Sequence, residues 1–474
     1  MQAQATAFRR ETSPPDPAAG REPASGALLA GPLAGSAPLA GSGPLAGSAP
    51  LAGSAPLAGS GLAGLLRATA AAHPARPAFV DLGDKPGWSG RPGMSWTYGA
   101  AAEIVARLAR GIRAWRLAPG SRVGLWFAGS SESLVAHLAV EAAGHVPCPM
   151  PAAWEEAQVL AAVEAAGIPA VLTQARLGGR RPAEILCRVA LQHFALRYLA
   201  AFGPDVPDGV INLDALALER GTGPAEAPPP ARGLVSFAGR DPARPVYRPG
   251  EALLAAAALH LDAARIGPGE RLLTLLPPDD LRGLATGLGA ALVAGATLAC
   301  MPVLDAAALR GALTAAEPRG LHLVAPAFLE SVLHELPLGG LRALTLAHRA
   351  PARLTARQLR TGRLDGPRIV DALALDEEAL LSRARGADDI ALALADPAGT
   401  ALPAGLMELR CGADGSLSLR GAACRAGPIR DGMPALPGAE AWRPAPYRAT
   451  LLAGTATGLV PADQPVPADQ PMPG

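Results

Sequence analysis

Residues 95–151 read SWTYGAAAEIVARLARGIRAWRLAPGSRVGLWFAGSSESLVAHLAVEAAGHVPCPMP, and they carry the clearest structural pattern of the chain. Short apolar runs typical of strands (SWTYG, RVGLWFA and HVPCPMP) alternate with segments whose apolar residues recur at helical spacing. The same alternation continues to residue 202 and resumes from residue 233 to residue 375. Short apolar strands separated by helices predict parallel sheets covered by helices on both faces.

A proline-rich linker, GTGPAEAPPPARG, separates two such runs. We therefore predict an α/β fold with two lobes of parallel-sheet layers, the first over residues 63–228 and the second over residues 229–385. Beyond Gly386 the helical period fades, and MELRCGADGSLSLRG predicts a hairpin that turns at Asp414 and Gly415. A small β-rich subdomain is expected over residues 386–460.

Both ends of the chain are repetitive. Residues 31–60 consist of five hexapeptides of the form GPLAGS or APLAGS, and the chain ends in VPADQPVPADQPMPG. Hexapeptide repeats can form a β-helix, but five copies with a proline in each favour a flexible tether. We predict disordered tails over residues 1–62 and 461–474.

Composition excludes several classes of partner. The net charge is +1 and no block of like charges occurs, so neither a nucleic acid nor an anionic membrane is indicated. The N-terminus lacks an apolar signal core, and the five cysteines form no CxxC pair, which is typical of reduced thiols in a cytoplasmic protein.

One apolar segment has the length of a membrane span. Residues 283–304 carry no charge over 22 residues. They also contain four glycines and a proline, which favours a buried helix near 281–293, a Gly-Ala turn and a strand over a membrane span.

The order of these blocks resembles the adenylate-forming superfamily, which includes acyl-CoA synthetases, fatty-acyl-AMP ligases and non-ribosomal adenylation domains. In that family a Thr-Tyr strand enters a helix, a Pro-Gly-x-Arg-Val turn enters a strand, and a helix ends in Ala-Gly before a proline-rich strand. Residues 95–151 match this order, and IGPGERLLTLLPPDDLRGLATGLGAALVAGATLACMP continues it in the second lobe. The resemblance extends over about residues 63–380, and it implies ATP and Mg²⁺ as ligands.

The loop that would hold the ATP phosphates departs from the family pattern. In such enzymes it is rich in Ser, Thr and Gly and ends in Pro-Lys, because hydroxyls, amides and a cation stabilise the phosphates. Here only Gly239 and Pro245 keep their places, while the hydroxyl run becomes Arg240-Asp241-Pro242 and the lysine becomes Val246. Arg240 or Arg244 could bind a phosphate with two parallel hydrogen bonds. The alternative is a solvent-facing turn with solvated charges.

Further departures affect the other nucleotide-contacting blocks. Asp280 stands where the family commonly has a His beside the nucleotide, and Pro444-Ala445-Pro446 stands where a Thr-Gly-Asp would hold the ribose. The expected aromatic-Gly-x-Thr-Glu block is replaced by DALALDEEAL. Glu377 could serve as the metal carboxylate, but residues 376–378 (DEE) more readily predict the acidic first turn of a helix.

Other chemistry has little support. The eight histidines form no spaced ligand pair, so no metal site is predicted, and His348, at the end of a predicted strand, is the one candidate for a role at an acyl pocket. Lys85 is the only lysine and lies in LGDKPGWSG, which predicts an exposed loop. The family's ligases carry a mobile C-terminal domain with a catalytic lysine, whereas this chain finishes at Gly474 with no lysine after Lys85.

Two functional hypotheses remain. The first is a degenerate, non-catalytic homologue of AMP-dependent ligases that needs no cofactor and binds an acyl group, a carrier protein or another partner protein. The second is an active ATP-dependent acyl-AMP or acyl-CoA ligase with a divergent nucleotide site, completed by a lid domain in trans. An unrelated α/β enzyme is the third alternative. Loss of every nucleotide-contacting block favours the first hypothesis.

Overall fold

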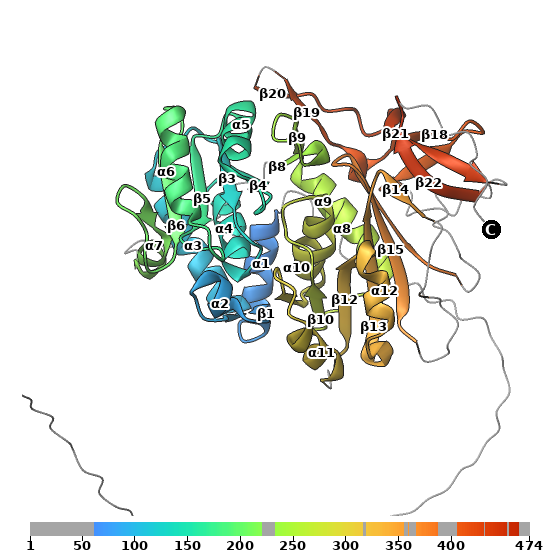
Figure 1. Ribbon diagram of the computed structural model, residues 1–474, viewed down its shortest axis with the longest axis horizontal. Helices are drawn as coiled ribbons and strands as arrows, with labels where there is room; N and C mark the ends of the chain where they lie inside the picture. The colour runs from blue at the N-terminus through green and yellow to red at the C-terminus, as the bar shows by residue number, and fades with distance from the viewer. Residues whose placement is uncertain are drawn as a thin grey trace, which may run out of the picture. The chain divides into compact units, whose positions relative to one another are not determined.

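The computed structural model describes residues 61–219, 233–315, 319–354, 359, 366–386, 405–430, 432–452 and 455–463. The predicted α/β fold is confirmed, with two parallel-sheet layers and additional antiparallel sheets (Figure 1). Nearly all of the repetitive N-terminal tail, most of the C-terminal tail and the proline-rich linker lie outside the described residues.

The first parallel sheet has five strands, all of which pair in parallel. In order across the sheet they are β4 (Val146–Met150), β3 (Arg122–Trp126), β5 (Ala170–Gln174), β6 (Tyr198–Phe202) and β7 (Ile211–Asn212). The predicted strands RVGLWFA and HVPCPMP are therefore confirmed, and β5 and β6 continue the alternation that the sequence predicts up to residue 202.

The second sheet has eight strands, with an antiparallel strand at each edge of a parallel centre. In order they are β16 (Ala379–Ala384), β15 (Arg368–Leu375), β13 (Leu341–Arg349), β12 (Leu321–Pro326), β10 (Arg271–Thr274), β11 (Thr297–Cys300), β1 (Pro77–Asp81) and β2 (Ser95–Thr97). Strands β1 and β2 precede the first sheet in sequence, yet β1 pairs with β11. This pairing ties the start of the chain to the second sheet.

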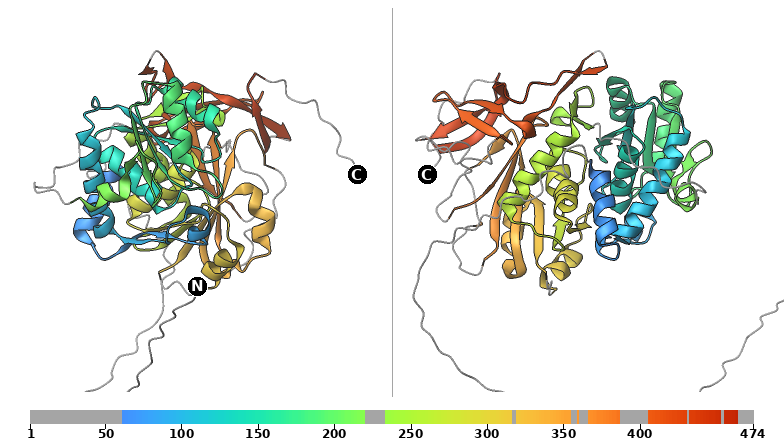
Figure 2. Two further views of the ribbon diagram at one scale, coloured as in Figure 1. Left: turned by 60° about the vertical axis from the view of Figure 1, so that its left-hand side comes forward. Right: turned by 180° about the vertical axis from the view of Figure 1, so that it is seen from behind.

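Helices cover both faces of each parallel sheet. Between the sheets lie α1 (Leu62–Ala72), α3 (Tyr98–Ala114), α4 (Ser131–Ala142), α8 (Gly250–Ala264) and α10 (Ala290–Ala294), which share one hydrophobic core with strands of both (Figures 1 and 2). The outer face of the first sheet carries α5 (Glu156–Ala166) and α6 (Pro182–Gln192), and that of the second carries α11 (Ala306–Thr314) and α12 (Glu330–His334). Short helices α2 (Lys85–Ser89) and α7 (Leu213–Leu218) complete the first part of the chain.

Local sequence explains where α3 begins. The Thr97 hydroxyl accepts a hydrogen bond from the Ala100 amide at 3.2 Å and so caps the helix, and Arg113 lies in its last turn. The buried side of α3 includes Val105, Leu108 and Ile112, at the helical spacing that the sequence predicts.

Residues 283–302 of the uncharged segment are buried or half-buried, as expected, whereas Val303 and Leu304 are exposed, and the helix of the segment is not regular. Helix α9 (Leu281–Gly283) passes into a π-helical segment over Leu284–Gly289 and then into α10. At Gly295 the backbone turns with φ 63° and leads into β11. None of the helices in the described part of the chain has the length and hydropathy to span a bilayer.

Two antiparallel sheets follow. The hairpin β8 (Leu234–Phe237) and β9 (Pro245–Arg248) is extended by β19 (Gly427–Arg430) and β20 (Met433–Pro434). The other sheet comprises β14 (Ala352–Arg353), β22 (Thr455–Pro461), β21 (Arg443–Leu452), β18 (Ser416–Arg420) and β17 (Glu408–Cys411). The predicted hairpin at Asp414 and Gly415 joins β17 and β18, and Gly415 has φ 79°.

Candidate functional site

The loop of residues 238–244 is the turn of the β8–β9 hairpin. The sequence predicts a strand that leads into a helix, but the short strand β9 intervenes before α8 begins at Gly250. Gly239 and Arg240 both have positive φ, of 62° and 57°. A positive φ is uncommon for a non-glycine residue, so the conformation at Arg240 is held by its surroundings.

The Gly239 amide is bonded within the chain. It donates a hydrogen bond of 2.6 Å to Oδ1 of Asp376. Asp376 lies in the turn between β15 and β16 and has a φ of 54°. The helix predicted to start at residues 376–378 is therefore wrong: β15 and β16 form a hairpin, and the acidic residues lie in its turn, where no free helical amides need a negative charge.

Arg240 is bound to the loop that follows β10. Its Nη2 lies 2.8 Å from both carboxylate oxygens of Asp279, and 3.9 Å from Oδ2 of Asp280. Asp280 caps α9 by accepting a hydrogen bond from the Gly283 amide at 3.0 Å, and it also pairs with Arg282 at 2.7 Å. The predicted candidates Arg240 and Asp280 thus meet, but each through an internal ion pair.

Arg349, which the sequence analysis does not single out, joins the remaining carboxylates. Its Nη2 lies 2.6 Å from Asp280 and 3.3 Å from Glu377, and its Nη1 lies 3.9 Å from Asp376. Glu377 is buried, and its other oxygen accepts a hydrogen bond from the Leu281 amide at 2.9 Å. Arg349 directly follows the candidate His348 in the sequence, and this position is the one sequence signal that could have identified it.

We call these eight charged residues the loop cluster: Asp279, Asp280, Asp376, Glu377, Arg240, Arg244, Arg282 and Arg349. It contains equal numbers of carboxylates and guanidinium groups. Arg244 lies at its edge, 3.9 Å from Asp376 and largely exposed.

Burial and close charges shift the pKa values in the loop cluster in opposite directions. Burial, with the neighbouring Asp280, raises the pKa of Asp279 to about 6 and that of Glu377 to about 7. Burial acts in the same sense on Asp280, but Arg282 and Arg349 outweigh it and hold the pKa of Asp280 well below its usual range. Asp280 is therefore the carboxylate on which the negative charge is concentrated.

His348 lies in a different set of contacts. Its Nε2 is 2.9 Å from Asp371, which is held by Arg385 at 2.7 Å, and Arg385 in turn pairs with Glu330 at 3.0 Å. Asp371 and Arg385 are almost completely buried. This chain of ion pairs crosses β13 and β15 to α12 and leaves His348 apart from the loop cluster.

Lys85 is not an exposed loop lysine, so that prediction is wrong. It is the first residue of α2, only 1% of it is exposed, and its Nζ lies 2.5 Å from Asp81 and 2.6 Å from Glu132. Arg91 binds the same Glu132 at 2.9 Å and bridges to Asp214 at 2.6 Å. The Lys85 ammonium is thus buried between two carboxylates, an arrangement that sequence context alone does not reveal.

Comparisons with known proteins agree with this architecture. Residues 66–231 match the family model described as AMP-binding enzyme. The apo structure of MbtA from Mycobacterium smegmatis has a TM-score of 0.62 at 18% identity, covering 85% of this chain and 75% of that one. ATP-bound MatB from Rhodopseudomonas palustris also has a TM-score of 0.62, at 16% identity, covering 84% and 78%.

The Klebsiella oxytoca NpsA N-terminal subdomain in complex with 3-hydroxyanthranilyl-AMSN has a TM-score of 0.56 at 16% identity, covering 85% of this chain and 99% of that one. A comparison with curated protein sequences finds no match. Residues 66–231 are thus similar to AMP-binding enzymes, and the described chain has a fold similar to that of these adenylate-forming proteins. At these identities the structural likeness establishes the fold.

The residues around the loop do not fit the ATP and Mg²⁺ that the superfamily implies. The Gly239 amide is taken by Asp376, and Val246, which replaces the lysine, is buried in an apolar contact with Ala238 and Ala426. Pro245 is the first residue of β9 and pairs with Phe237. A polyanion here would meet four carboxylates, all of which already have arginine partners.

A small cavity adjoins the loop cluster. A cavity of about 10 Å³ lies beside Asp279, lined in part by His137 and Met150, and it has room for about one water molecule. Among the residues that the structure describes, no three His, Cys, Asp or Glu side chains are arranged to hold a metal ion. The loop cluster is thus a self-paired site within a superfamily fold.

Proposed function

We propose that this chain is a non-catalytic member of the superfamily whose nucleotide site is filled by its own ion pairs. Its scaffold would then bind an acyl group, a carrier protein or another partner protein. The observation that carries the proposal is the hydrogen bond from the Gly239 amide to Asp376, because it uses the loop's own phosphate-binding donor inside the protein.

The electrostatics of the loop cluster support the same conclusion. A phosphate bound at Nη2 of Arg240 would compete with Asp279 for that atom, and one bound at Nη2 of Arg349 would compete with Asp280 and Glu377. These carboxylates are buried, and a buried carboxylate that loses its cation is destabilised. The existing ion pairs therefore oppose phosphate binding at these two atoms.

The alternative is an active ATP-dependent acyl-AMP or acyl-CoA ligase, completed by a lid domain in trans. One observation favours it. Within the described part of the chain, Nε of Arg240 and both Nε and Nη1 of Arg349 are buried without a hydrogen-bond acceptor. Buried guanidinium donors that lack an acceptor suit an anion, and these come from Arg240 within the loop and from Arg349 of the loop cluster.

The carrier-protein part of the proposal has a parallel among similar structures. One of them is an artificially fused adenylation-PCP di-domain built from Klebsiella oxytoca NpsA and ThdA, at 17% identity and a TM-score of 0.56. For this chain, an acyl carrier protein is therefore the first partner to test.

Isothermal titration calorimetry on the full chain tests the proposal. Mg-ATP and a non-hydrolysable acyl-adenylate mimic are titrated separately, with ATP-binding MatB from Rhodopseudomonas palustris as the positive control. Circular dichroism confirms that each sample is folded. We expect no saturable heat from either ligand with this chain.

Saturable micromolar binding of either ligand would overturn the proposal in favour of the alternative. In that case Arg240→Met, Arg244→Met and Glu377→Gln would each be titrated again. Loss of binding in these variants but not in Arg188→Met, a change in an exposed ion pair on α6, would locate the nucleotide at the loop cluster.

A further inference from the structure

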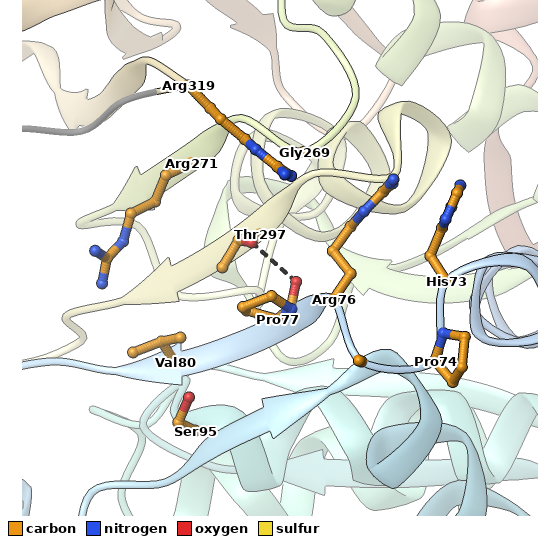
Figure 3. Close-up of a pocket in the computed structure, with 11 residues that line it drawn as sticks. His73, Pro74, Arg76, Pro77, Val80, Ser95, Gly269, Arg271, Thr297 and Arg319 are labelled. Carbon is orange, nitrogen blue, oxygen red and sulfur yellow. Dashed lines mark hydrogen bonds between the residues drawn. The ribbon is translucent and has the colours of Figure 1, made fainter. Parts of the chain in front are cut away.

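A large cavity lies at the edge of the second sheet where its parallel strands begin, opposite the loop cluster. Its volume is about 720 Å³. Its polar lining comes from His73, Arg76, Ser95, Arg271, Thr297 and Arg319, and its apolar lining includes Pro74, Pro77 and Val80 (Figure 3). Cavities of about 300–1,000 Å³ hold small molecules and cofactors.

Strand register explains why these side chains lie together. Arg271 is the first residue of β10 and lies opposite Thr297 of β11 on one side and Leu321 of β12 on the other. Arg76 directly precedes β1, and Arg319 lies two residues before β12. The loop cluster, in contrast, follows β10, β13 and β15 at the other end of the same strands.

The cavity is positively charged. Among the residues that the structure describes, its lining includes three arginines and one histidine but no carboxylate. Glu270, adjacent to Arg271, is directed elsewhere: its carboxylate lies 2.8 Å from His322 and 3.2 Å from Arg342. Positive charge therefore gathers at this edge although the whole chain has a net charge of only +1.

Two of these arginines differ from those of the loop cluster. Arg240, Arg282, Arg349 and Arg385 all pair with carboxylates, as do many exposed arginines. Arg76 and Arg319 make no ion pair with any described carboxylate. Arg76 donates only to the Gly295 carbonyl oxygen, at 3.0 Å.

Each of these two guanidinium groups lies beside one glycine of a hydrogen-bonded pair. The Gly269 amide donates to the Gly295 carbonyl oxygen at 3.0 Å, and that same oxygen accepts from Arg76. A Cβ atom placed on Gly269 would lie 2.7 Å from Nη1 of Arg319, and one on Gly295 would lie 3.2 Å from Nη1 of Arg76. In Figure 3, Arg76 and Arg319 extend toward the Gly269 turn, whereas Arg271 extends away from it.

The ends of helices explain part of this arrangement. Gly295 caps the C-terminus of α10, and a cation beside a helix C-terminus is stabilised by the helix dipole. This accounts for Arg76 but not for Arg319, which is exposed and lies in the turn before β12. Two like charges brought together without a carboxylate gain stability from an anion placed between them.

We propose that this cavity binds a soluble small molecule that bears a phosphate or diphosphate group, held by Arg76 and Arg319. Guanidinium groups bind phosphate oxygens with two parallel hydrogen bonds, which suits this group better than a single carboxylate. The apolar lining from Pro74, Pro77 and Val80 would contact the rest of the ligand. The site lies apart from the loop cluster and does not depend on the proposed loss of nucleotide binding.

Titration of the full chain with inorganic phosphate and with pyrophosphate tests the proposal. We expect pyrophosphate to bind more tightly than phosphate, and both to weaken as salt increases. Arg319→Met should weaken pyrophosphate binding about tenfold or more, because a charge-assisted hydrogen bond is lost. This variant should keep its fold, since Arg319 bonds to no described residue.

Two control variants locate the binding. Arg188→Met removes an exposed arginine on α6, and Arg240→Met removes one from the loop cluster. Both should bind pyrophosphate as the unchanged chain does. Equal affinity in Arg319→Met and the unchanged chain, or loss of binding in Arg240→Met alone, would overturn the proposal.

A third arm separates a soluble ligand from a lipid head group. Phosphatidylcholine vesicles with and without phosphatidic acid are mixed with the chain and sedimented. We expect no added binding from phosphatidic acid. Binding to these vesicles without binding to pyrophosphate in solution would also overturn the proposal.

Discussion

The amide of Gly239 and the carboxylate of Asp376 form a hydrogen bond of 2.6 Å between two turns that are 137 residues apart in the sequence. Gly239 lies in the β8–β9 turn and Asp376 in the β15–β16 turn. The bond fixes the loop predicted to hold phosphates against the second sheet. The chain therefore supplies from its own sequence an acceptor at the place where a ligand oxygen is expected.

This bond should contribute measurably to stability. Asp376→Ala leaves the Gly239 amide without its acceptor, so we expect a loss of about 1–3 kcal/mol in the free energy of unfolding. Asp376→Asn should cost less, because its side-chain oxygen still accepts and Asn tolerates the positive φ of 54°. Urea unfolding of both variants measures this, with the exposed Asp205→Ala as control. Equal losses for Ala and Asn would contradict it.

Replacement of Lys85 should lower the free energy of unfolding more than replacement of Asp376 does. Lys85→Met leaves Asp81 and Glu132 buried without their ammonium partner, and removal of one member of a buried ion pair costs about 3–5 kcal/mol. The matched control is Arg107→Met, which removes a more exposed i,i+4 pair with Glu103 and should cost about 0.3–0.5 kcal/mol. Urea unfolding compares the two. A loss below about 1 kcal/mol for Lys85→Met would show that Arg91 alone neutralises the site.

The sequence predicts helices and strands better than it predicts contacts between distant segments, and this difference has a physical reason. Apolar periodicity depends on neighbours a few residues away, so the strands from β3 to β6 and the helices between them follow directly from the sequence. Pairing of β1 with β11 joins segments more than 200 residues apart, and no local pattern encodes it. The burial of Lys85 depends on that same pairing, because Asp81 is the last residue of β1.

In the loop cluster, too, the sequence does not predict the contacts between distant segments. Sequence comparison identifies Gly239, Arg240, Asp280 and Glu377 as candidates because they occupy the family's nucleotide blocks, and the structure brings them together. Their partners are sequence neighbours of these candidates or of His348, namely Asp279, Asp376 and Arg349. Which carboxylate each arginine contacts depends on how three turns of the fold come together. An acidic run is compatible with both a helix start and a hairpin turn, and the antiparallel pairing of β16 determines which one forms.

The cysteines should react in two groups. Burial raises the pKa of Cys148 to about 12 and that of Cys424 to about 11, and it raises the pKa of Cys300 as well. Because the thiolate is the reactive form, these three thiols should resist DTNB in the native chain. The half-buried Cys187 and Cys411 should react first. Absorbance at alkaline pH, before and after adding guanidinium chloride, counts the thiols, and rapid reaction of all five without denaturant would contradict this.

A last prediction concerns Glu141, which lies on α4 and is buried between helices. Its Oε1 accepts a hydrogen bond of 2.9 Å from the Ala63 amide at the start of α1. Burial raises the pKa of Glu141 to about 7, and the hydrogen bond from Ala63 only partly opposes this. No cation pairs with it among the described residues, so the folded chain favours the protonated form.

The sign of the pH effect follows from this shift. The pKa of Glu141 is higher in the folded chain than in the unfolded chain, so its contribution to stability is complete below the unfolded pKa and is lost as pH rises through about 7. Glu141→Gln does not titrate, and its amide oxygen can still accept from Ala63. The free energy of unfolding of the unchanged chain minus that of the variant should therefore fall by roughly 2–3 kcal/mol from about pH 5 to about pH 8. Urea unfolding at a series of pH values measures this difference. A flat line for Glu141→Gln would mean that its carboxyl is solvated or paired in the folded chain.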